Sequence, residues 1–426
     1  MPLPDSIKRL VNFKRSRSEE KFKRRFPKSP RFPSLSNAQH NKGPTMFLSQ
    51  SILMNYSSRS PSPISEDDEP GRARMRKSGD DSVKMFEPVQ DGPLPIEAPA
   101  AHYNNVSVAF SENTNVTMAA SLSDKNRISV MQWDPKIEKK KFSMITIVDP
   151  NDERGPPPTV FQVKFVTPSS RNAPLIVVAT TIGAIIYDSA QQKNRMSFNP
   201  MEQVLGKKEE DQRSRHFCRG ISCVDNSIVV GTSTGAIMVF NCSGGTSVSV
   251  KKPLNEHKFP IADIATCKFD EITASGDMRG NLVVWQKGMK SPKKYPTDLP
   301  ITVLNVLRRQ VLVGTVYGTI NIYAASNGTL MANVAAHSRP VTGISVAPES
   351  AYVLTASEDS CVRVFKLHTR KPEAYQLEFR YGDQLDDRKI IGACFANDRG
   401  SSMVFTAYDF PWLLLYKIFK KAMPQP

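Results

Sequence analysis

An all-β fold, built from seven similar four-stranded sheets in a closed ring, is predicted by three observations. Short runs of alternating apolar residues bounded by turn residues recur along the chain, which is typical of half-buried antiparallel strands. A strand-ending aromatic recurs every 38 to 54 residues, near the roughly 40–45 expected for one blade with insertions. A sheet this small has little core of its own, so copies should stack around an axis as a seven-bladed β-propeller. The seven aromatics are Trp133, Tyr187, Phe240, Trp285, Tyr323, Phe365 and Tyr416.

The clearest copy is the stretch Ala336–Leu367, which contains a loop histidine and three short strands. The first strand, Val341–Val346, ends in a turn that contains proline. The second, Tyr352–Ala356, closes on the tight turn Ser357–Ser360. The third, Cys361–Phe365, alternates apolar residues and ends in the aromatic. This unit is the template for the other six.

The same pattern predicts the remaining strands. Repeat one is expected at Val106–Phe110, Thr117–Leu122, Ile128–Trp133 and Phe142–Val148. Repeat two is expected at Val160–Phe165, Leu175–Thr180 and Ala184–Tyr187, with an irregular fourth strand near Met196–Phe198. Repeats three to five begin with Gly220–Val224, Ile261–Thr266 and Ile301–Leu307, followed by Ser227–Thr232, Ile272–Gly276 and Gln310–Thr315. The last repeat has Ile390–Phe395, Met403–Ala407 and Leu413–Ile418.

The last repeat lacks a fourth strand, because only Phe419–Pro426 follows it. An unpaired strand edge is prone to aggregation. We therefore expect a strand from Val83–Ala98 to pair with the last repeat and close the ring. This divides the chain into a tail, residues 1–82, and a seven-bladed propeller, residues 83–426.

The tail is predicted to be disordered and basic. It is rich in Ser, Pro, Lys and Arg, and contains no lasting apolar period. The formal net charge of the whole chain is +16, but residues 1–100 carry 18 Lys or Arg and 12 Asp or Glu against 39 and 29 in the rest. The excess is therefore spread over both parts. The basic cluster of the tail consists of Lys21, Lys23, Arg24 and Arg25.

Such a basic cluster is typical of nuclear import signals and nucleic-acid patches, and a plain solvated tail is the simpler interpretation. Ser29, Ser60 and Ser62 each precede proline, and Ser65 precedes an acidic run. These contexts suit proline-directed and acidophilic kinases. Each phosphate adds roughly −1.5 to −2 charges, so phosphorylation of the tail as a switch is a hypothesis.

Composition argues against several classes of site. The six cysteines include no C-x-x-C pair and no histidine at zinc-finger spacing. The glycine turns lack a phosphate-loop pattern. We therefore expect no metal and no cofactor. No signal peptide opens the chain and no apolar run approaches the roughly 18–20 residues of a membrane span. A soluble, cytoplasmic protein is expected, with nuclear and vesicle-associated locations left open.

The repeats resemble the WD-repeat β-propellers. Trp133-Asp134 is a full Trp-Asp pair, His257 and His337 lie two periods apart, and Asp359 occupies a turn between second and third strands. More narrowly, the segments HFCRGISCVDNSIVVGTSTGAIMVFN, EHKFPIADIAT, IIGACF and FTAYD are similar to the WD repeat-containing protein 54 group, over roughly residues 100–418. The resemblance implies a seven-bladed WD-repeat propeller.

In repeat six, the resemblance implies a structural brace of the blade. His337 would bond to Thr355, and Asp359 would bond to the histidine or to nearby backbone. Phe365 has no indole N–H, so the final link to the aromatic is absent. A histidine, a hydroxyl and an aspartate also fit a catalytic triad. No nucleophile elbow or oxyanion-hole motif accompanies them, so the brace is preferred.

In repeat four, the resemblance implies a similar brace that contains His257, Ser275 and Trp285. Arg279 stands where the turn aspartate is expected. Asp277, two residues earlier, is the candidate substitute.

Two residues of the propeller are candidate partner contacts, Arg380 and Trp412. Trp412 is expected in the turn Phe410-Pro411-Trp412 rather than in a strand. Exposed aromatics and arginines are typical interface anchors, and packing between blades is the alternative.

Three functions follow in order of preference. The first is a non-catalytic scaffold that binds other proteins, of unknown identity, through a rigid ring. The second is binding to nucleic acid or to an anionic membrane through the basic tail, with an affinity that falls steeply with salt. The third, an enzyme, is disfavoured because no repeated set of acidic or histidine ligands is found. The oligomeric state is open.

Overall fold

The computed structural model describes residues 85–89, 92–111, 115–123, 126–134, 140–189, 195–201, 216–242, 247–368 and 376–419. The chain divides into two compact units, Met1–Asp68 and Glu69–Pro426, and the described residues all belong to the second. Within them the structure has 29 strands and no helix, so no described helix is of the length and apolarity that crossing a membrane requires. The predicted boundary between residues 82 and 83 lies outside the described residues and stays a prediction.

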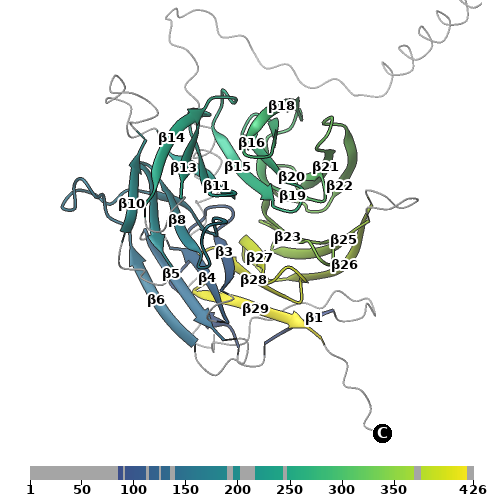
Figure 1. Ribbon diagram of the computed structural model, residues 1–426. Helices are drawn as coiled ribbons and strands as arrows, with labels where there is room; N and C mark the ends of the chain where they lie inside the picture. The colour runs from purple at the N-terminus through teal and green to yellow at the C-terminus, as the bar shows by residue number, and fades with distance from the viewer. Residues whose placement is uncertain are drawn as a thin grey trace, which may run out of the picture. The chain divides into compact units, whose positions relative to one another are not determined.

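The strands form seven sheets arranged as the blades of a ring (Figure 1). Blade 1 contains β3 (Val106–Ser111), β4 (Val116–Leu122), β5 (Arg127–Trp133) and β6 (Lys140–Thr146). Blade 2 contains β7 (Val160–Val166), β8 (Leu175–Thr180), β9 (Gly183–Asp188) and β10 (Arg195–Pro200). Blade 3 contains β11 (Cys218–Val224), β12 (Ser227–Thr232), β13 (Ile237–Asn241) and β14 (Ser249–Leu254). Blade 4 contains β15 (Ile261–Cys267), β16 (Ile272–Asp277), β17 (Asn281–Gln286) and β18 (Lys290–Pro296).

The other three blades follow the same plan. Blade 5 contains β19 (Ile301–Leu307), β20 (Gln310–Thr315), β21 (Thr319–Ala324) and β22 (Leu330–Ala335). Blade 6 contains β23 (Val341–Ala347), β24 (Tyr352–Ser357), β25 (Cys361–Leu367) and β26 (Leu377–Gln384). Blade 7 contains β27 (Ile390–Phe395), β28 (Ser402–Ala407) and β29 (Trp412–Ile418), completed by β1 (Phe86–Pro88) and β2 (Leu94–Pro95). The predicted seven-bladed ring is confirmed.

Burial changes systematically from the centre of the ring outward. The second strands β8 and β20 are buried along their whole length, because each blade packs between two others. The outermost strands β6 and β18 are mostly exposed and carry several lysines. Charged side chains on an outer strand discourage edge-to-edge pairing with another chain. The blades are therefore polar at the outer rim and apolar where they pack against neighbouring blades.

The core consists of seven buried clusters, one between each pair of adjacent blades. Strand side chains alternate between the two faces of a sheet, so each blade contributes to two clusters. On β29, for example, Leu413 and Leu415 pack toward blade 1, whereas Leu414 and Tyr416 pack toward blade 6. The ring therefore has no single centre of apolar packing, and its closure depends on every interface.

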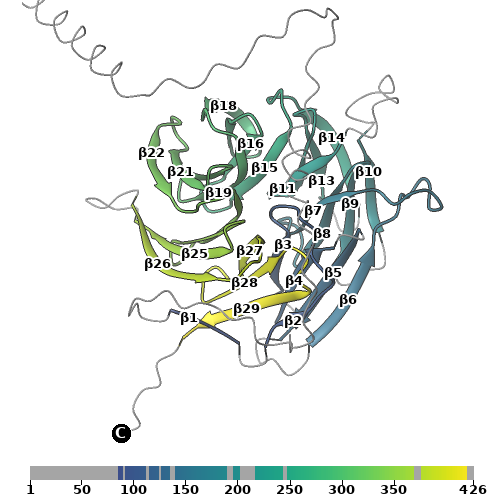
Figure 2. The ribbon, with the colours of Figure 1, turned by 180° about the vertical axis from the view of Figure 1, so that it is seen from behind.

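The N-terminal segment closes the ring, as predicted. Figure 2 shows β1 and β2 along the outer edge of β29. Phe86 of β1 lies opposite Ile418, and Leu94 of β2 lies opposite Leu413. Both side chains are buried, with 1% and 2% exposed area. The edge of blade 7 that would otherwise be open is paired and covered by apolar side chains.

After β2 the chain runs from the rim to the central channel. The N–H of Ile96 donates to the carbonyl of Pro411 in blade 7, at 3.1 Å. The N–H of Ala100 donates to Leu122 of blade 1, at 2.9 Å, and the N–H of Asn104 to Thr342 of blade 6, at 2.8 Å. This segment therefore joins the first and last blades and reaches the far side of the channel before β3 begins.

Candidate functional site

Blade 4 holds a buried network centred on a histidine. His257, in the loop before β15, places Nε2 2.7 Å from Ser275 Oγ and Nδ1 3.1 Å from Asp277 Oδ2. The indole N–H of Trp285 donates to Ser275 Oγ at 2.9 Å. A carboxylate only accepts, so Nδ1 of the imidazole donates and Nε2 accepts from the serine hydroxyl. The residues predicted from the sequence are thus brought together in one chain of hydrogen bonds.

Asp277 takes the position of the turn aspartate in this blade. Its carboxylate also accepts from the N–H groups of Arg279 and Asn281, each at 3.0 Å. Burial acts to raise the pKa of this carboxyl, but the hydrogen bonds from His257 and Asn281 outweigh it and hold the pKa below its usual value. Arg279 itself points its guanidinium toward the ring of Phe259, 5.5 Å away.

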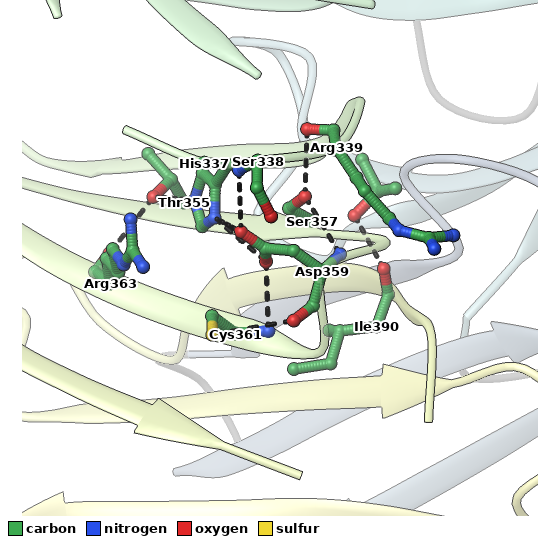
Figure 3. Close-up of polar contacts among 10 residues, drawn as sticks. His337, Ser338, Arg339, Thr355, Ser357, Asp359, Cys361, Arg363 and Ile390 are labelled. Atoms are coloured by element: carbon green, nitrogen blue, oxygen red, sulfur yellow. Dashed lines mark hydrogen bonds and ion pairs between the residues drawn. The ribbon is translucent and has the colours of Figure 1, made fainter. Parts of the chain in front are cut away.

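Blade 6 holds the second network (Figure 3). Nε2 of His337 lies 2.8 Å from Thr355 Oγ1, and Nδ1 lies 3.1 Å from both carboxylate oxygens of Asp359. The carbonyl of Arg363 lies 3.3 Å from Thr355 Oγ1 and is a second, more distant acceptor for the single hydroxyl proton. Phe365 offers no N–H, so blade 6 has no aromatic donor to the hydroxyl in the position that the Trp285 indole has in blade 4.

The loop that carries His337 is positioned by the neighbouring blade. The N–H of His337 donates to the carbonyl of Gly318, in the turn between β20 and β21, at 2.9 Å. Gly318 has a φ of +80°, and a Cβ there would overlap the carbonyl oxygen of His337. A glycine is therefore required in this turn for the loop to approach so closely.

Both networks are enclosed. The side chains of Ser275 and Thr355 belong to residues with 0% exposed area. A substrate has no access to either hydroxyl, which argues against a nucleophile at these positions. The geometry is that of side chains that connect a loop, a strand and a turn within one blade.

The pKa of Asp359 gives a test of the blade 6 network. Burial acts to raise the pKa, but the hydrogen bond and charge of His337 lower it from 3.8 to about 2. A depressed carboxyl pKa stabilises the folded state above the unfolded pKa, and this stabilisation is lost as the pH falls through the folded pKa. The free energy of unfolding of the wild type should therefore exceed that of Asp359→Asn above about pH 4, and the difference should vanish toward about pH 2. Urea unfolding at several pH values measures it; a pH-independent difference would contradict the ionised pair.

The mouth of the central channel forms a second candidate site. The loops before the inner strands and the turns between second and third strands meet at one end of the ring. The N–H of Met278 donates to the carbonyl of Pro260, and the N–H of Ser233 to that of Phe217, at 2.9 and 2.8 Å. Aromatic and arginine residues gather here: Phe161, Phe217, Phe259, Arg279, Tyr317 and Arg339. We call these six residues the channel-mouth face.

Rings on this face stack on one another. Phe161 and Phe217 lie 4.8 Å apart in a stacked arrangement, and His102 lies 5.1 Å from Phe161. Burial, with the charge of Arg219, lowers the pKa of His102 to about 4, so this imidazole is neutral at physiological pH. The guanidinium of Arg219 lies 5.7 Å above the ring of Tyr103. The face is therefore rigid and partly apolar at its centre.

A buried carboxylate below the channel mouth holds the segment that runs from β2 to β3. Asp263 is 1% exposed and accepts from the amide of Asn104 at 2.9 Å and from the N–H of Leu304 at 3.1 Å. Burial raises the pKa of Asp263 despite these bonds. The hydroxyl of Tyr103 donates to Glu358 at 2.7 Å. The segment that contains Tyr103 and Asn104 is thus fixed by hydrogen bonds to blades 4 and 6. These contacts join residues far apart in the chain, so no sequence motif predicted them.

Two of the predicted partner contacts, Arg380 and Trp412, lie within the described residues. Arg380, on β26, is exposed and forms an ion pair with Glu378 at 3.0 Å. Trp412 was expected in a turn, and this prediction is wrong: Trp412 begins β29 and lies opposite Pro95 of β2. β2 pairs with β29 at Leu413 and Trp412, beyond the residues that pair with β28. Trp412 therefore belongs to the sheet and is half-buried.

The remaining predicted residues lie in the tail, outside the described residues. They are Lys21, Lys23, Arg24, Arg25, Ser29, Ser60, Ser62 and Ser65. Their roles stay predictions.

The cysteine thiols are not activated. Four of the six cysteines are buried, and burial raises the pKa of Cys223 to about 12. A thiol with so high a pKa is protonated at neutral pH and behaves as a small apolar group. Within the described residues, no group of three or more His, Cys, Asp or Glu is placed to hold a metal ion.

Comparison with known proteins finds similar chains. A family model described as WDR54 matches residues 98–416. WD repeat-containing protein 54 of Mus musculus is 32% identical over 213 residues, which cover 47% of this chain and 63% of the relative. The protein of the same description from Homo sapiens is 31% identical over 206 residues, which cover 45% and 61%. The matched region thus spans less than two thirds of the length of these relatives.

Solved structures share the architecture. A chain of "Crystal Structure of Mitotic Checkpoint Complex" has a TM-score of 0.60 and 15% identity, and the match covers 80% of this chain and 98% of that chain. "Structure of U3-55K" has a TM-score of 0.57 and 13% identity, with coverage of 78% and 100%. At these identities the likeness shows the fold alone.

Proposed function

Because this chain belongs to the WDR54 family of WD-repeat proteins, we propose that it is a non-catalytic scaffold that binds other proteins through its channel-mouth face. WD-repeat propellers are protein-interaction scaffolds as a class. The observation that carries the choice of face is the concentration of exposed aromatic and arginine side chains around the channel. Residues of these types dominate the binding energy of protein interfaces.

Two aromatic rings of this face are exposed to solvent. Tyr317, in the turn between β20 and β21, has 65% of its area exposed, and Phe259 has 37%. In Figure 3 the guanidinium of Arg339 extends away from the His337 network. Because these side chains project from turns held by backbone hydrogen bonds, binding would order few new groups, which favours affinity.

Affinity capture from cells tests this face. The double variant Tyr317→Ser/Arg339→Glu should lose at least one wild-type partner by about tenfold in recovered amount, since a large aromatic anchor and a cation are removed together. A matched control, Leu330→Ser/Lys290→Glu, changes an exposed apolar residue and a cation on the outer strands β22 and β18. It should keep every partner that binds through the channel-mouth face. Retention of every partner by the channel-mouth variant, at an unchanged melting temperature, would refute the proposed face.

A second candidate function is supported by charge. The chain carries a formal net charge of +16, and the outer strands β14 and β18 expose Lys251, Lys252 and Lys293. These features, with the basic tail, favour nucleic acid or an anionic membrane as partner. Phosphorylation of the tail would then weaken binding by adding negative charge. The same capture repeated at about 50 and about 200 mM salt separates the candidates, because charge-driven binding falls steeply over this range.

A further inference from the structure

One outer strand of the ring lacks the charges and prolines that the others carry. The strand β22 reads Leu-Met-Ala-Asn-Val-Ala, and within the described residues its outer edge pairs with no other strand. The outer strands β6, β10, β14, β18 and β26 each contain a lysine or an arginine, and β1 and β2 each contain a proline. Charges and prolines on an edge strand oppose pairing with another chain. Among the described outer strands, β22 is therefore the one that is open to an added strand.

Apolar side chains of β22 face blade 6. Val334 and Ala332 lie opposite Ile320 and Ile322 of β21, which belong to the buried cluster between blades 5 and 6. Paired residues lie on the same face of a sheet, so Val334 and Ala332 point the same way. Together with Met331 they pack against that cluster and stay partly exposed. The core between these blades therefore continues as an apolar surface to the open edge.

Blade 6 supplies the other side of this surface. Phe379 of β26 lies opposite Phe365 of β25, and the two rings pack edge to face with their centroids 6.0 Å apart. Phe365 is buried in the same cluster, whereas Phe379 keeps 54% of its area exposed. Leu377 also packs against the cluster. We call the following residues the rim strip: Met331, Ala332, Val334, Leu377 and Phe379.

An arginine lies beside the rim strip. Arg363 is two residues from Phe365 on β25, so its side chain leaves the same face of the sheet, the face toward blade 5. It lies opposite Thr355 of β24, and Figure 3 shows the two residues side by side. On β26 the residue opposite Arg363 is Gly382, which has no side chain to cover the guanidinium. The arginine is half-buried and interacts with the thiol of Cys361.

No carboxylate of β21, β22, β25 or β26 faces Arg363 or the rim strip. The strands β21, β22 and β25 contain no acidic residue. On β26, Glu378 and Asp383 each lie next to a residue that faces blade 5, so they belong to the opposite face of the sheet. In the turn before β25, Asp359 is paired with His337. These strands therefore present an apolar surface beside a cation that has no anionic partner on them.

We propose that an extended segment of a partner protein adds to the edge of β22 as a fifth strand of blade 5. The segment carries a large apolar residue and, two residues away, an acidic residue. Main-chain hydrogen bonds to β22 hold it, and side chains at alternate positions give specificity. The apolar side chain packs on Phe379 and Met331, and the carboxylate pairs with Arg363.

The spacing of two residues follows from the register of blade 6. Phe379 lies opposite Phe365, and Gly382 lies opposite Arg363, so the exposed ring and the guanidinium are two strand positions apart on one face. Side chains at positions i and i+2 of an added strand have the same spacing and share a face. A second copy of this chain fits less well as the occupant, because β22 itself contains no acidic residue to pair with Arg363.

Hydrogen–deuterium exchange with a defined peptide pool tests this surface. The probe is a pool of N-acetylated, C-amidated heptapeptides Ser-Thr-X-Thr-Glu-Thr-Ser, in which X is Phe, Leu, Met or Trp, together with the pool of reversed sequence. At saturating peptide, amides of residues 328–336 should exchange about tenfold more slowly, because the added strand accepts from them. Peptides with Lys in place of Glu, or with Glu directly next to X, should bind about tenfold more weakly. No protection of β22 at saturating peptide would overturn the proposal.

Methylation of the peptide backbone tests strand addition directly. In an added strand, only every second N–H points to its neighbour. Two peptides are therefore made, one with N-methyl groups on X and every second residue from it, the other with N-methyl groups on the residues between. One pattern should abolish binding and the other should leave it within about threefold. Binding of both peptides, or of neither, would contradict the addition of a strand to β22.

Two variants of the surface give independent readouts. Phe379→Ser removes an exposed ring and should weaken binding of the acidic pool by about tenfold. Arg363→Gln should weaken it similarly and should bind the Glu and Lys pools nearly alike. The matched control Phe142→Ser/Lys141→Gln changes a half-exposed ring and a cation on β6, and it should bind normally. Normal affinity for the acidic pool in both Phe379→Ser and Arg363→Gln would refute the rim strip as the site.

The same peptides separate this proposal from the proposed function. Tyr317→Ser/Arg339→Glu should bind the acidic pool with wild-type affinity and with the same protection of β22. Loss of peptide binding in that variant, at an unchanged melting temperature, would place the peptide on the channel-mouth face and refute the rim strip. Sedimentation at rising protein concentration tests the other occupant. A dimer that Phe379→Ser disrupts would make a second copy the occupant and overturn the proposed partner segment.

Discussion

Deletion of residues 1–98 is expected to abolish cooperative folding of the propeller. The deletion removes β1, β2 and the buried side chains of Phe86, Leu94 and Ile96, which have 1%, 2% and 7% exposed area. Burial of each such side chain contributes about 1.5–3 kcal/mol, so the loss is about 5 kcal/mol or more. This is comparable with the whole stability of an ordinary domain. The edge of β29 also becomes free to pair with other chains.

Differential scanning calorimetry and size-exclusion chromatography measure the effect. The deleted protein should show aggregation and no cooperative transition near that of the full chain. The matched control is deletion of residues 1–84, which keeps every closing contact described above and should melt like the full chain. A folded, monomeric protein after deletion of residues 1–98 would mean that the closing strands are dispensable.

Replacement of His257 by alanine is expected to cost about 3 kcal/mol of unfolding free energy. The change leaves the carboxylate of Asp277 and the hydroxyl of Ser275, both with 0% exposed area, without their histidine partner. His337→Ala should cost about 1–3 kcal/mol. The smaller effect follows because no indole N–H completes the network of blade 6, and the side chain of Asp359 is 6% exposed whereas that of Asp277 is fully buried.

Chemical denaturation of the two variants gives these values. The control is His368→Ala, which removes a histidine whose ion pair with Glu378 is exposed to solvent. It should change stability by less than about 1 kcal/mol. Equal stabilities of His257→Ala and the wild type would show that the buried network is not a brace of the blade.

The strands were predictable because their signals are local. Alternating apolar residues between turn residues specify a strand whatever the rest of the chain does. Thus β23 and β24 begin at the predicted residues. The irregular strand near Met196 also forms, as β10, with a shift of register between Arg195 and Ser197.

The positions that sequence reasoning missed depend on pairing with distant residues. Trp412 follows a proline in an apparent turn, but its partner Pro95 lies more than three hundred residues earlier in the chain and extends the strand to include it. Blade 1 lacks the serine acceptor of the blade 4 network, because Ala119 stands at the position that Ser275 has in blade 4. That difference is readable only once the register of both blades is known.

The sequence by itself determined that this chain repeats one sheet seven times and needs its N-terminal segment to complete the last, because period, turns and strand-ending aromatics are local properties. Only the tertiary structure decided which side chains surround the channel mouth. That surface joins residues from several blades, and their proximity is set by ring closure, a constraint that no local pattern encodes.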